Sequence, residues 1–303
     1  MRGNRMVVYT AIYGNHDGLK EPSVSLDDCS LVCFTDSGDL ESDVFEVRKY
    51  PGISFDPTRC ARFFKLLPHL FFPDYEYSMW IDASIIIKKG NLRDLVERYL
   101  RDDDIAMYAH PERNCIYEEG AICIAQGKDL PQIINDQLDS YRRNGYPERN
   151  GLVETGVILR RHLAPAMIRF DTEWWNEVVK YSRRDQLSFN YIASKNHLHW
   201  ATIEGNLRDG EYFKLTHHTH STALDQSIPE KDYVAKVDLL HDKIQLFEND
   251  LIQRENQIDM LTGQVDALDK SLSLKIGRKI PFGKGIRRLF VRRDKNHRNV
   301  IRK

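Results

Sequence analysis

The chain has 303 residues, 41% hydrophobic and 10% aromatic, which is enough for a large core and excludes an intrinsically disordered chain. The 44 Lys and Arg nearly balance the 45 Asp and Glu, so the formal net charge at pH 7 is −1. No run approaches the roughly 18 apolar residues of a membrane-spanning helix, and residues 1–7 lack the apolar stretch of a signal peptide.

Regular apolar patterns predict the following elements in chain order. Apolar runs that end in polar turns predict strands at residues 6–13, 31–35, 77–81 and 153–159. Helical spacing predicts helices within residues 57–73 and around residues 92–100, 130–144, 174–182 and 185–194. Strands that alternate with helices favour one α/β domain over residues 1–228, with a mainly parallel central sheet. Ligands bind such sheets beyond the carboxyl ends of the strands, where we expect Tyr13, Asp36 and Asp82 to meet.

The five cysteines do not show the tight spacing of a metal site. They are Cys29, Cys33, Cys60, Cys115 and Cys123. We therefore expect reduced structural thiols in a reducing cytosol.

Asp82 follows the strand at residues 77–81 directly. A carboxylate in this position can hold Mg²⁺ or Mn²⁺ against a diphosphate, because both ions prefer hard oxygen ligands, or it can simply cap a turn. His218 and His220 belong to a histidine-rich segment and would face the same way on an extended chain. They either complete the shell of the cation or belong to a loop that binds nothing.

Basic residues recur at three-residue spacing before the strand at residues 77–81. Arg59, Arg62 and Lys65 share one helical face, which is either solvated or directed at phosphate, and we favour phosphate. Farther along, Asp185 and Gln186 stand at the start of a predicted helix. Asp185 either caps that helix or, with Gln186, contacts sugar hydroxyls.

Further polar residues fall in predicted loops at residues 110–113, 118–120 and 154–156. The adjacent carboxylates of Glu118 and Glu119 are compatible with general acid or base chemistry. Two neighbouring carboxylates in a loop are a weak signal for it.

Together these segments resemble the glycosyltransferase-like domain family named after plant turgor-regulation and mucilage proteins. The resemblance covers about residues 5–220. It is carried by residues 9–14, 33–36, 67–69, 80–82, 154–156, 160–162 and 184–186, and by Arg59, Arg62, Lys65 and His110. It implies a GT-A-like fold, a nucleotide-sugar-binding α/β sandwich with a metal bound near an Asp-x-Asp sequence.

The resemblance also implies a set of donor-binding residues. Ala11, Tyr13 and Asp36 would line the nucleotide pocket, while Arg59, Arg62 and Lys65 would face its phosphates. Asp82 and Ser84 would stand where the metal-binding pair normally lies. Ser84 departs from the family pattern, because a hydroxyl is a poorer cation ligand than a carboxylate.

The remaining implied site residues concern the metal and the chemistry. His218 or His220 would complete the shell of a divalent cation, Mn²⁺ or Mg²⁺, together with Asp82. Asp185 and Gln186 would contact the donor sugar or the acceptor, and with Glu154 they form the expected catalytic set.

The last quarter of the chain shows a heptad pattern. Apolar residues alternate at gaps of three and four from Val237 to Leu272, interrupted by Arg254, which predicts a coiled coil at residues 232–275. β-branched residues at most first seam positions, with mostly leucine at the second, favour a parallel homodimer through residues 234–275. The alternative is a helix that packs back on the domain.

Residues 276–303 form a predicted basic tail. Residues 275–303 contain twelve Lys or Arg and a single acid, Asp294, so the rest of the chain has a net charge of −12. The tail mixes these cations with Ile, Leu and Phe, which favours an anionic membrane surface over nucleic acid. We therefore expect a cytoplasmic protein, peripheral on the inner face of the cell membrane.

The expected function is that of a bacterial glycosyltransferase of the hexosyltransferase type. It would move a sugar from a nucleotide-sugar donor to a saccharide or glycolipid acceptor, most plausibly a lipid-linked saccharide in surface-polysaccharide synthesis. Two alternatives stay open: a ceramidase-like hydrolase acting on a lipid amide, and a non-catalytic coiled-coil scaffold.

Overall fold

The computed structural model describes residues 5–14, 17–26, 28–53, 56–216, 257 and 260–264. The chain divides into two compact units, Met1–His241 and Asp242–Lys303. The residues described in the second unit are helical and exposed. Apart from them, the predicted coiled coil, dimer interface and basic tail lie outside the described residues, as do His218 and His220.

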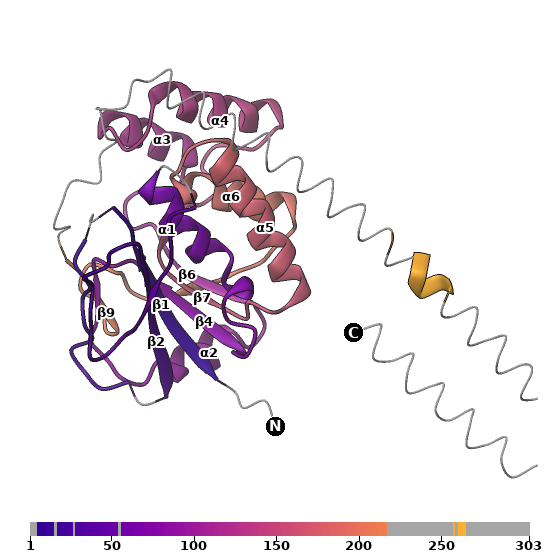
Figure 1. Cartoon of the computed structure of the whole chain (residues 1–303). Coiled ribbons are helices and arrows are strands. Elements are labelled where there is room, and N and C mark those ends of the chain that lie inside the picture. Colours follow the sequence, from indigo (N-terminus) through magenta and orange to yellow (C-terminus); the bar gives the residue numbers. More distant parts are fainter. Residues whose placement is uncertain are drawn as a thin grey trace, which may run out of the picture. The chain divides into compact units, whose positions relative to one another are not determined.

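A seven-stranded sheet forms the centre of the first unit (Figure 1). Its strands, in spatial order, are β3 (Glu46–Lys49), β2 (Cys29–Thr35), β1 (Met6–Ile12), β4 (Tyr77–Ile81), β7 (Val153–Arg160), β6 (Ile105–Ala109) and β8 (Ala201–Ile203). All neighbours in this sheet run parallel except the two pairs that contain β7. The predicted α/β fold with a mainly parallel central sheet is confirmed.

Because β7 runs in the reverse direction, its first residues lie at the edge of the sheet where the parallel strands end. The carboxyl ends of β1, β4 and β6 lie at this edge, and β7 begins there because it runs against its neighbours β4 and β6. The chain reaches β7 through α3 (Ile116–Ala125) and α4 (Pro131–Arg143), two helices that pack on each other beyond this edge (Figure 1). Residues 154–156, near the start of β7, therefore lie at the same edge of the sheet as the carboxyl ends of the parallel strands β1, β4 and β6.

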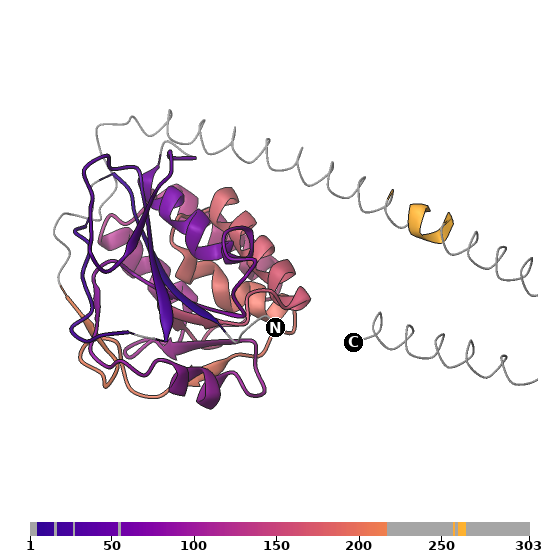
Figure 2. The same cartoon turned by 60° about the horizontal axis from the view of Figure 1, so that its bottom comes forward.

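Both faces of the sheet are covered, and the layers separate clearly in two views (Figure 1, Figure 2). One face packs against α1 (Pro57–Leu66), α5 (Pro165–Lys180) and α6 (Asp185–Lys195). The other packs against α2 (Arg93–Tyr99) and a two-stranded sheet of β5 (Ile85–Ile87) and β9 (Phe213–Leu215). Double coverage explains why all seven residues of β1 are buried and why all of them except Thr10 and the amphipathic Tyr9 are apolar.

Local signals explain where several helices start. Asp56 precedes α1 and its carboxylate accepts a hydrogen bond from the backbone N–H of Thr58 (3.0 Å), while Pro57 occupies the first turn. A short 3₁₀ turn, η1 (Pro68–Leu70), follows α1. Helix α5 begins at Pro165, nine residues before the predicted start at residue 174.

The predicted loops at residues 118–120 and 154–156 are wrong, because the first three residues belong to α3 and the other three to β7, where a strand at residues 153–159 was also predicted. Gly120 permits the close approach of α3 and α4: a Cβ atom there would collide with Leu138 Cδ1 of α4. A glycine chosen for helix packing has the same appearance in sequence as a glycine in a loop. Within the described residues, no helix combines the length and the apolarity that crossing a bilayer requires.

Candidate functional site

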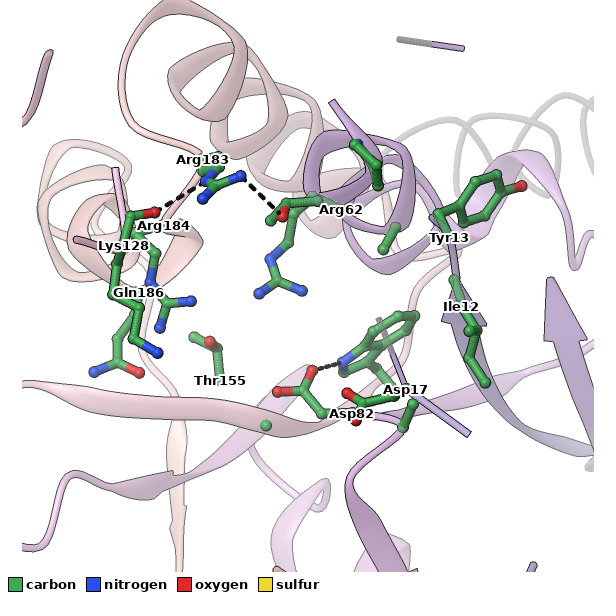
Figure 3. A pocket seen from close by; sticks show the side chains of 17 residues that line it. Ile12, Tyr13, Asp17, Arg62, Asp82, Lys128, Thr155, Arg183, Arg184 and Gln186 are labelled. Carbon is green, nitrogen blue, oxygen red and sulfur yellow. Dashed lines mark hydrogen bonds between the residues drawn. The ribbon is translucent and has the colours of Figure 1, made fainter. Parts of the chain in front are cut away.

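A cavity of about 190 Å³ lies at this edge of the sheet, where β1 and β4 end and β7 begins (Figure 3). Four cationic and two acidic residues are among those that line it: Arg62, Lys128, Arg183, Arg184, Asp17 and Asp82. The guanidinium groups of Arg62 and Arg184 point into the space above Asp82 and Thr155. The cavity therefore combines fixed positive charge with carboxylates at the position where α/β sheets bind ligands.

Arg62 reaches the cavity from α1 with a buried carboxylate behind it. Asp185, the first residue of α6, lies 2.7 Å from Arg62 Nε through one oxygen and 2.7 Å from Lys65 Nζ through the other. Burial by itself would raise the pKa of Asp185, but Arg62 and Lys65 hold it well below its ordinary value. Asp185 is 1% exposed and does not line the cavity, so it positions Arg62 and does not cap α6.

Asp82 is fixed on the opposite wall. Trp80 Nε1 donates a hydrogen bond to Asp82 Oδ1 (2.7 Å), and Lys65 Nζ lies 3.5 Å from the same oxygen. The buried Lys65 ammonium thus connects Asp82 with Asp185, and burial lowers the pKa of Lys65, partly offset by these two carboxylates. Asp82 Oδ2 is directed away from the Trp80 hydrogen bond, toward the cavity (Figure 3).

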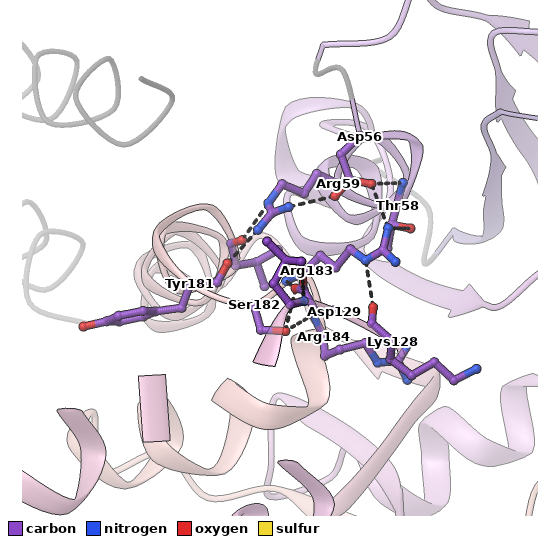
Figure 4. Close-up of polar contacts among 11 residues, drawn as sticks. Asp56, Thr58, Arg59, Lys128, Asp129, Tyr181, Ser182, Arg183 and Arg184 are labelled. Carbon is purple, nitrogen blue, oxygen red and sulfur yellow. Dashed lines mark hydrogen bonds and ion pairs between the residues drawn. The ribbon is translucent and has the colours of Figure 1, made fainter. Parts of the chain in front are cut away.

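Arg183 is held by a network at the junction of α5 and α6, which also fixes the backbone of Lys128 and Arg184 (Figure 4). Asp129 accepts hydrogen bonds from Ser182 Oγ and from the backbone N–H of Arg183, each 2.9 Å. The Arg183 side chain lies 3.3 Å from Asp56 and donates to the backbone carbonyl of Lys128 (2.9 Å). The network joins the starts of α1, α4 and α6, so it holds the cationic wall in one arrangement.

Two residues predicted to face phosphate are placed elsewhere. Arg59 is fully buried and donates to Asp56 (2.7 Å) and to the carbonyls of Val178 and Tyr181 (3.1 and 2.6 Å), so it anchors α1 to α5 (Figure 4). Lys65 is also fully buried and contacts the two carboxylates just described. Of the predicted row, Arg62 lines the cavity and the other two do not.

The predicted nucleotide-binding residues divide in a similar way. Ala11 and Tyr13 line the cavity, and Tyr13 is held by a hydrogen bond from its hydroxyl to the Tyr50 carbonyl (3.0 Å). Asp36 lies outside the lining, where its carboxylate accepts a hydrogen bond from the backbone N–H of Gly14 (3.3 Å). Asp36 therefore shapes the turn after β1, and its predicted contact with a nucleotide remains a prediction.

The predicted catalytic and metal residues also separate. Gln186 lines the cavity, and Glu154 lies on β7 outside it. Ser84 is 1% exposed and is not part of the lining, although it follows Asp82 by two residues. Its placement does not favour a role as a cation ligand or a donor contact.

The acidic wall fits a divalent cation in part. Asp82 and Asp17 both line the cavity and would offer two hard oxygen ligands. Within the described part of the chain, no group of three or more His, Cys, Asp or Glu could hold a metal ion. Mg²⁺ commonly takes one or two protein carboxylates and completes its shell with phosphate oxygens and water, which matches this donor set.

Sequence reasoning missed Asp17 and Lys128. Asp17 belongs to the turn after β1, which was expected at the site, so that turn could have indicated it. Lys128 follows Gly127, whose φ of 60° ends α3, and α3 itself was not predicted. The sequence therefore contained no signal that would place Lys128 at the cavity.

Comparison with known proteins gives a consistent result for the first unit. The sequence profile of the family described as "TOD1/MUCI70, glycosyltransferase-like domain" matches residues 1–217. The "Probable hexosyltransferase MUCI70" of Arabidopsis thaliana is 28% identical over 218 residues, 63% of this chain and 37% of that protein. The "Alkaline ceramidase TOD1" of the same plant is 24% identical over 245 residues, 69% of this chain and 52% of that protein. The chain thus spans about half or less of the length of these relatives.

Two solved structures show a distant likeness. One is the apo form of the bifunctional glycosyltransferase WbbM, with a TM-score of 0.41 and 13% identity over 66% of this chain and 39% of that chain. The other is apo mouse xyloside xylosyltransferase 1, with a TM-score of 0.37 and 11% identity over 66% and 84% of the two chains. Similarity at this level supports no argument about function.

Proposed function

The chain belongs to the TOD1/MUCI70 glycosyltransferase-like domain family, and from this premise we propose that it transfers a sugar from a nucleotide-sugar donor to a saccharide acceptor. The observation that carries the proposal is the cavity in which Arg62 and Arg184 face Asp82. Guanidinium groups bind phosphate oxygens in pairs, and a carboxylate across from them suits a divalent cation bound to the same phosphates.

The lining suggests a role for each wall. Arg62, Arg184 and Lys128 would bind the diphosphate, and Asp82 with Asp17 would hold the cation. Such a cation supplies further positive charge to the diphosphate when it is bound. The cavity is smaller than the 300–1,000 Å³ typical of ligand sites, so we expect the nucleoside to extend past Tyr13.

The transfer step uses these charges on the leaving group. The oxygen of an acceptor hydroxyl gives its proton to a base and forms a bond with the anomeric carbon, and the bond from that carbon to the phosphate oxygen breaks. The nucleoside diphosphate leaves with the electron pair of that bond. Cations fixed beforehand around the diphosphate stabilise the charge that develops there.

Substitution of Arg62 tests most directly whether the cationic side of the cavity binds the diphosphate of the donor. Wild-type protein should show a raised melting temperature with one of the UDP-, GDP- or CDP-sugars, in a screen with and without Mn²⁺, and should release the nucleoside diphosphate when acceptor is present. Arg62→Met should weaken binding of that donor by about 10- to 100-fold, because it removes hydrogen bonds to a charged group. Isothermal titration calorimetry measures the change.

Arg143→Met is the matched control, since Arg143 is exposed on α4 and does not line the cavity. Its donor affinity should equal that of the wild type. A wild type that neither binds nor cleaves any donor of the panel would contradict the proposal.

The name of one relative raises a hydrolase acting on ceramide as an alternative. The charged residues around this cavity favour a phosphate-bearing substrate over a long acyl chain. We therefore place sugar transfer first.

We further propose that the acceptor is a lipid-linked saccharide in bacterial surface-polysaccharide synthesis, reached from the inner face of the cell membrane. Support comes from the sequence of residues 232–303, whose heptads favour a parallel homodimer and whose basic tail suits an anionic membrane surface. A dimer would present two tails, and avidity would strengthen membrane binding.

Removal of residues 275–303 should move the protein from the membrane pellet to the supernatant. Each Lys or Arg near an anionic leaflet contributes about 1 kcal/mol, so losing twelve of them removes most of the attraction. Sedimentation with vesicles that contain anionic lipid measures the change, and neutral vesicles are the control. Equal sedimentation of full-length and truncated protein would count against a membrane-binding tail.

A further inference from the structure

A second group of charged side chains lies at the same edge of the sheet as the cavity, on and beyond β7. We name it the β7 cluster. Its members are His110, Glu112, Arg113, Glu119, Glu154 and Arg208, and none of them lines the cavity. They come from the end of β6, from α3, from β7 and from the segment after β8.

One half of the β7 cluster is rigid. Arg113 Nε donates to Glu119 Oε2 (2.7 Å), and both side chains are largely buried. His110 lies against this pair, and its Nδ1 accepts hydrogen bonds from the backbone N–H groups of Glu112 and Arg113 (3.2 and 3.0 Å). These contacts form a preformed polar wall from α3 and from the turn after β6.

The other half contains an unused hydrogen-bonding oxygen. Glu154 Oε2 is buried and has no hydrogen-bond partner among the described residues, although the Glu154 side chain is 15% exposed. Its other oxygen lies 4.0 Å from Arg208, an exposed residue that also contacts Glu112 (3.2 Å). Burial raises the pKa of Glu154 above its ordinary value. A carboxylate of this kind is available to accept a hydrogen bond, or a proton, from a bound molecule.

The β7 cluster borders the cavity at two points. Gly156 follows Glu154 by two residues on β7, in the stretch where the pairing of β7 with β6 shifts its register. Gly156 lines the cavity, and a Cβ atom there would lie 3.6 Å from Asp82 Oδ2, so the strand that carries Glu154 also borders Asp82. On the α3 side, Cys123 Sγ lies 3.7 Å from Glu119 Oε1, and the charge of Arg184, which lines the cavity, acts on the same thiol.

We propose that the β7 cluster binds hydroxyl groups of the saccharide acceptor and that Glu154 is the base of the transfer reaction. This inference rests on the proposed function. Carboxylates that accept and guanidiniums that donate suit the adjacent hydroxyls of a pyranose. Three carboxylates against two arginines disfavour an anionic sugar, so the acceptor residue at this site is a neutral one.

In the proposed step, a proton and a glycosyl group move in opposite directions. The acceptor O–H bond breaks and its proton moves to the Glu154 carboxylate, while the oxygen forms a bond with the anomeric carbon of the donor. The bond from that carbon to the diphosphate breaks, and the nucleoside diphosphate leaves with the electron pair. A base with a raised pKa suits proton abstraction near neutral pH.

The test uses the full chain and the donor that the melting screen selects. Neutral acceptor probes are methyl glycosides of glucose, galactose and mannose, whose contact with the protein is measured by saturation-transfer NMR in the presence of the nucleoside diphosphate. Glu154→Gln should keep donor affinity within twofold and keep the glycoside signal, while the rate of transfer falls at least 100-fold. Arg113→Gln should weaken the glycoside signal without changing donor affinity.

Glu46→Gln is the control, because it makes the same change in an exposed ion pair with Arg48 on the edge strand β3. This variant should transfer sugar at the wild-type rate. If Arg113→Gln does not fold, Arg208→Gln at the exposed side of the β7 cluster replaces it. Transfer by Glu154→Gln at the wild-type rate overturns the inference, as does a wild type that binds donor and contacts no glycoside. A wild type that binds no donor fails at the earlier step and overturns the proposed function instead.

Discussion

Replacing Asp185 with asparagine should lower the free energy of unfolding by about 3–5 kcal/mol, because the change removes one partner of a buried charge pair. Lys65 is fully buried and has Asp185 Oδ2 as its nearest carboxylate oxygen, at 2.7 Å. An amide leaves that ammonium with the more distant Asp82 carboxylate, at 3.5 Å, as its countercharge. Urea denaturation at pH 7 measures the loss, and the affinity for the donor should fall as well, since Arg62 loses the group that positions it.

The stabilisation by Asp185 has a defined pH dependence. The pKa of Asp185 in the folded protein lies below the ordinary value of about 3.9. Its contribution is therefore complete above that ordinary pKa and is lost as the pH falls toward the folded pKa. The stability difference between wild type and Asp185→Asn should shrink below about pH 4 for that reason.

Asp209→Asn provides the control for this prediction. Asp209 pairs with Lys88 at the same distance of 2.7 Å, but its side chain is 70% exposed. Exposed pairs contribute about 0–1 kcal/mol, so this variant should unfold almost like the wild type. A similarly small loss in Asp185→Asn would show that the buried pair does not hold α1 to α6.

The α/β alternation was enough to predict the edge of the sheet at which the cavity lies. Tyr13 and Asp82 line the cavity because each follows a parallel strand, and that relation depends on strand direction alone. The reversal of β7 was not predictable in this way. It depends on α3 and α4, and Gly120 in α3 gave the signal of a loop.

The basic row on α1 shows a second limit of sequence reasoning. Arg59 and Arg62 lie about 60° apart around the helix, so the pattern places both on one face. Their partners lie far along the chain: Arg59 donates to carbonyls at the end of α5, and Arg62 contacts Asp185 of α6. Which arginine faces the cavity is therefore decided by the packing of α5 and α6, which a repeat of three residues does not encode.

The carboxylates behind the cationic wall determine its shape. Asp185 fixes Arg62, and Asp56 with Asp129 fixes Arg183. Charges held in this way need not reorganise when a diphosphate binds or leaves, which is the condition for strong electrostatic stabilisation of a leaving group. Under the proposed function, the buried acids would thus contribute to transfer without touching the substrate.

Asp82→Asn should lower the rate of sugar transfer at least 100-fold, about 2.7 kcal/mol in transition-state stabilisation, while the fold is retained. An amide keeps the shape of Asp82 and can still accept the hydrogen bond from Trp80 Nε1. It removes the negative charge that faces Arg62 and Arg184 and would bind a cation on the diphosphate. The initial rate of nucleoside diphosphate release at saturating donor measures the loss.

A titration with Mn²⁺ then separates two roles of Asp82. If Asp82 binds the cation, the variant should need a higher Mn²⁺ concentration for its remaining activity, since one hard oxygen ligand is lost. If Asp82 acts only by the electrostatic attraction of its charge for Lys65 and the cationic wall, the Mn²⁺ dependence of the activity should be unchanged, and the affinity for the donor should change instead. Asp139→Asn, at an exposed ion pair with Arg142 on α4, should change neither quantity. Transfer by Asp82→Asn at the wild-type rate would show that Asp82 has no role in the reaction. It would also contradict the proposal that residues at the ends of the parallel strands form the active site.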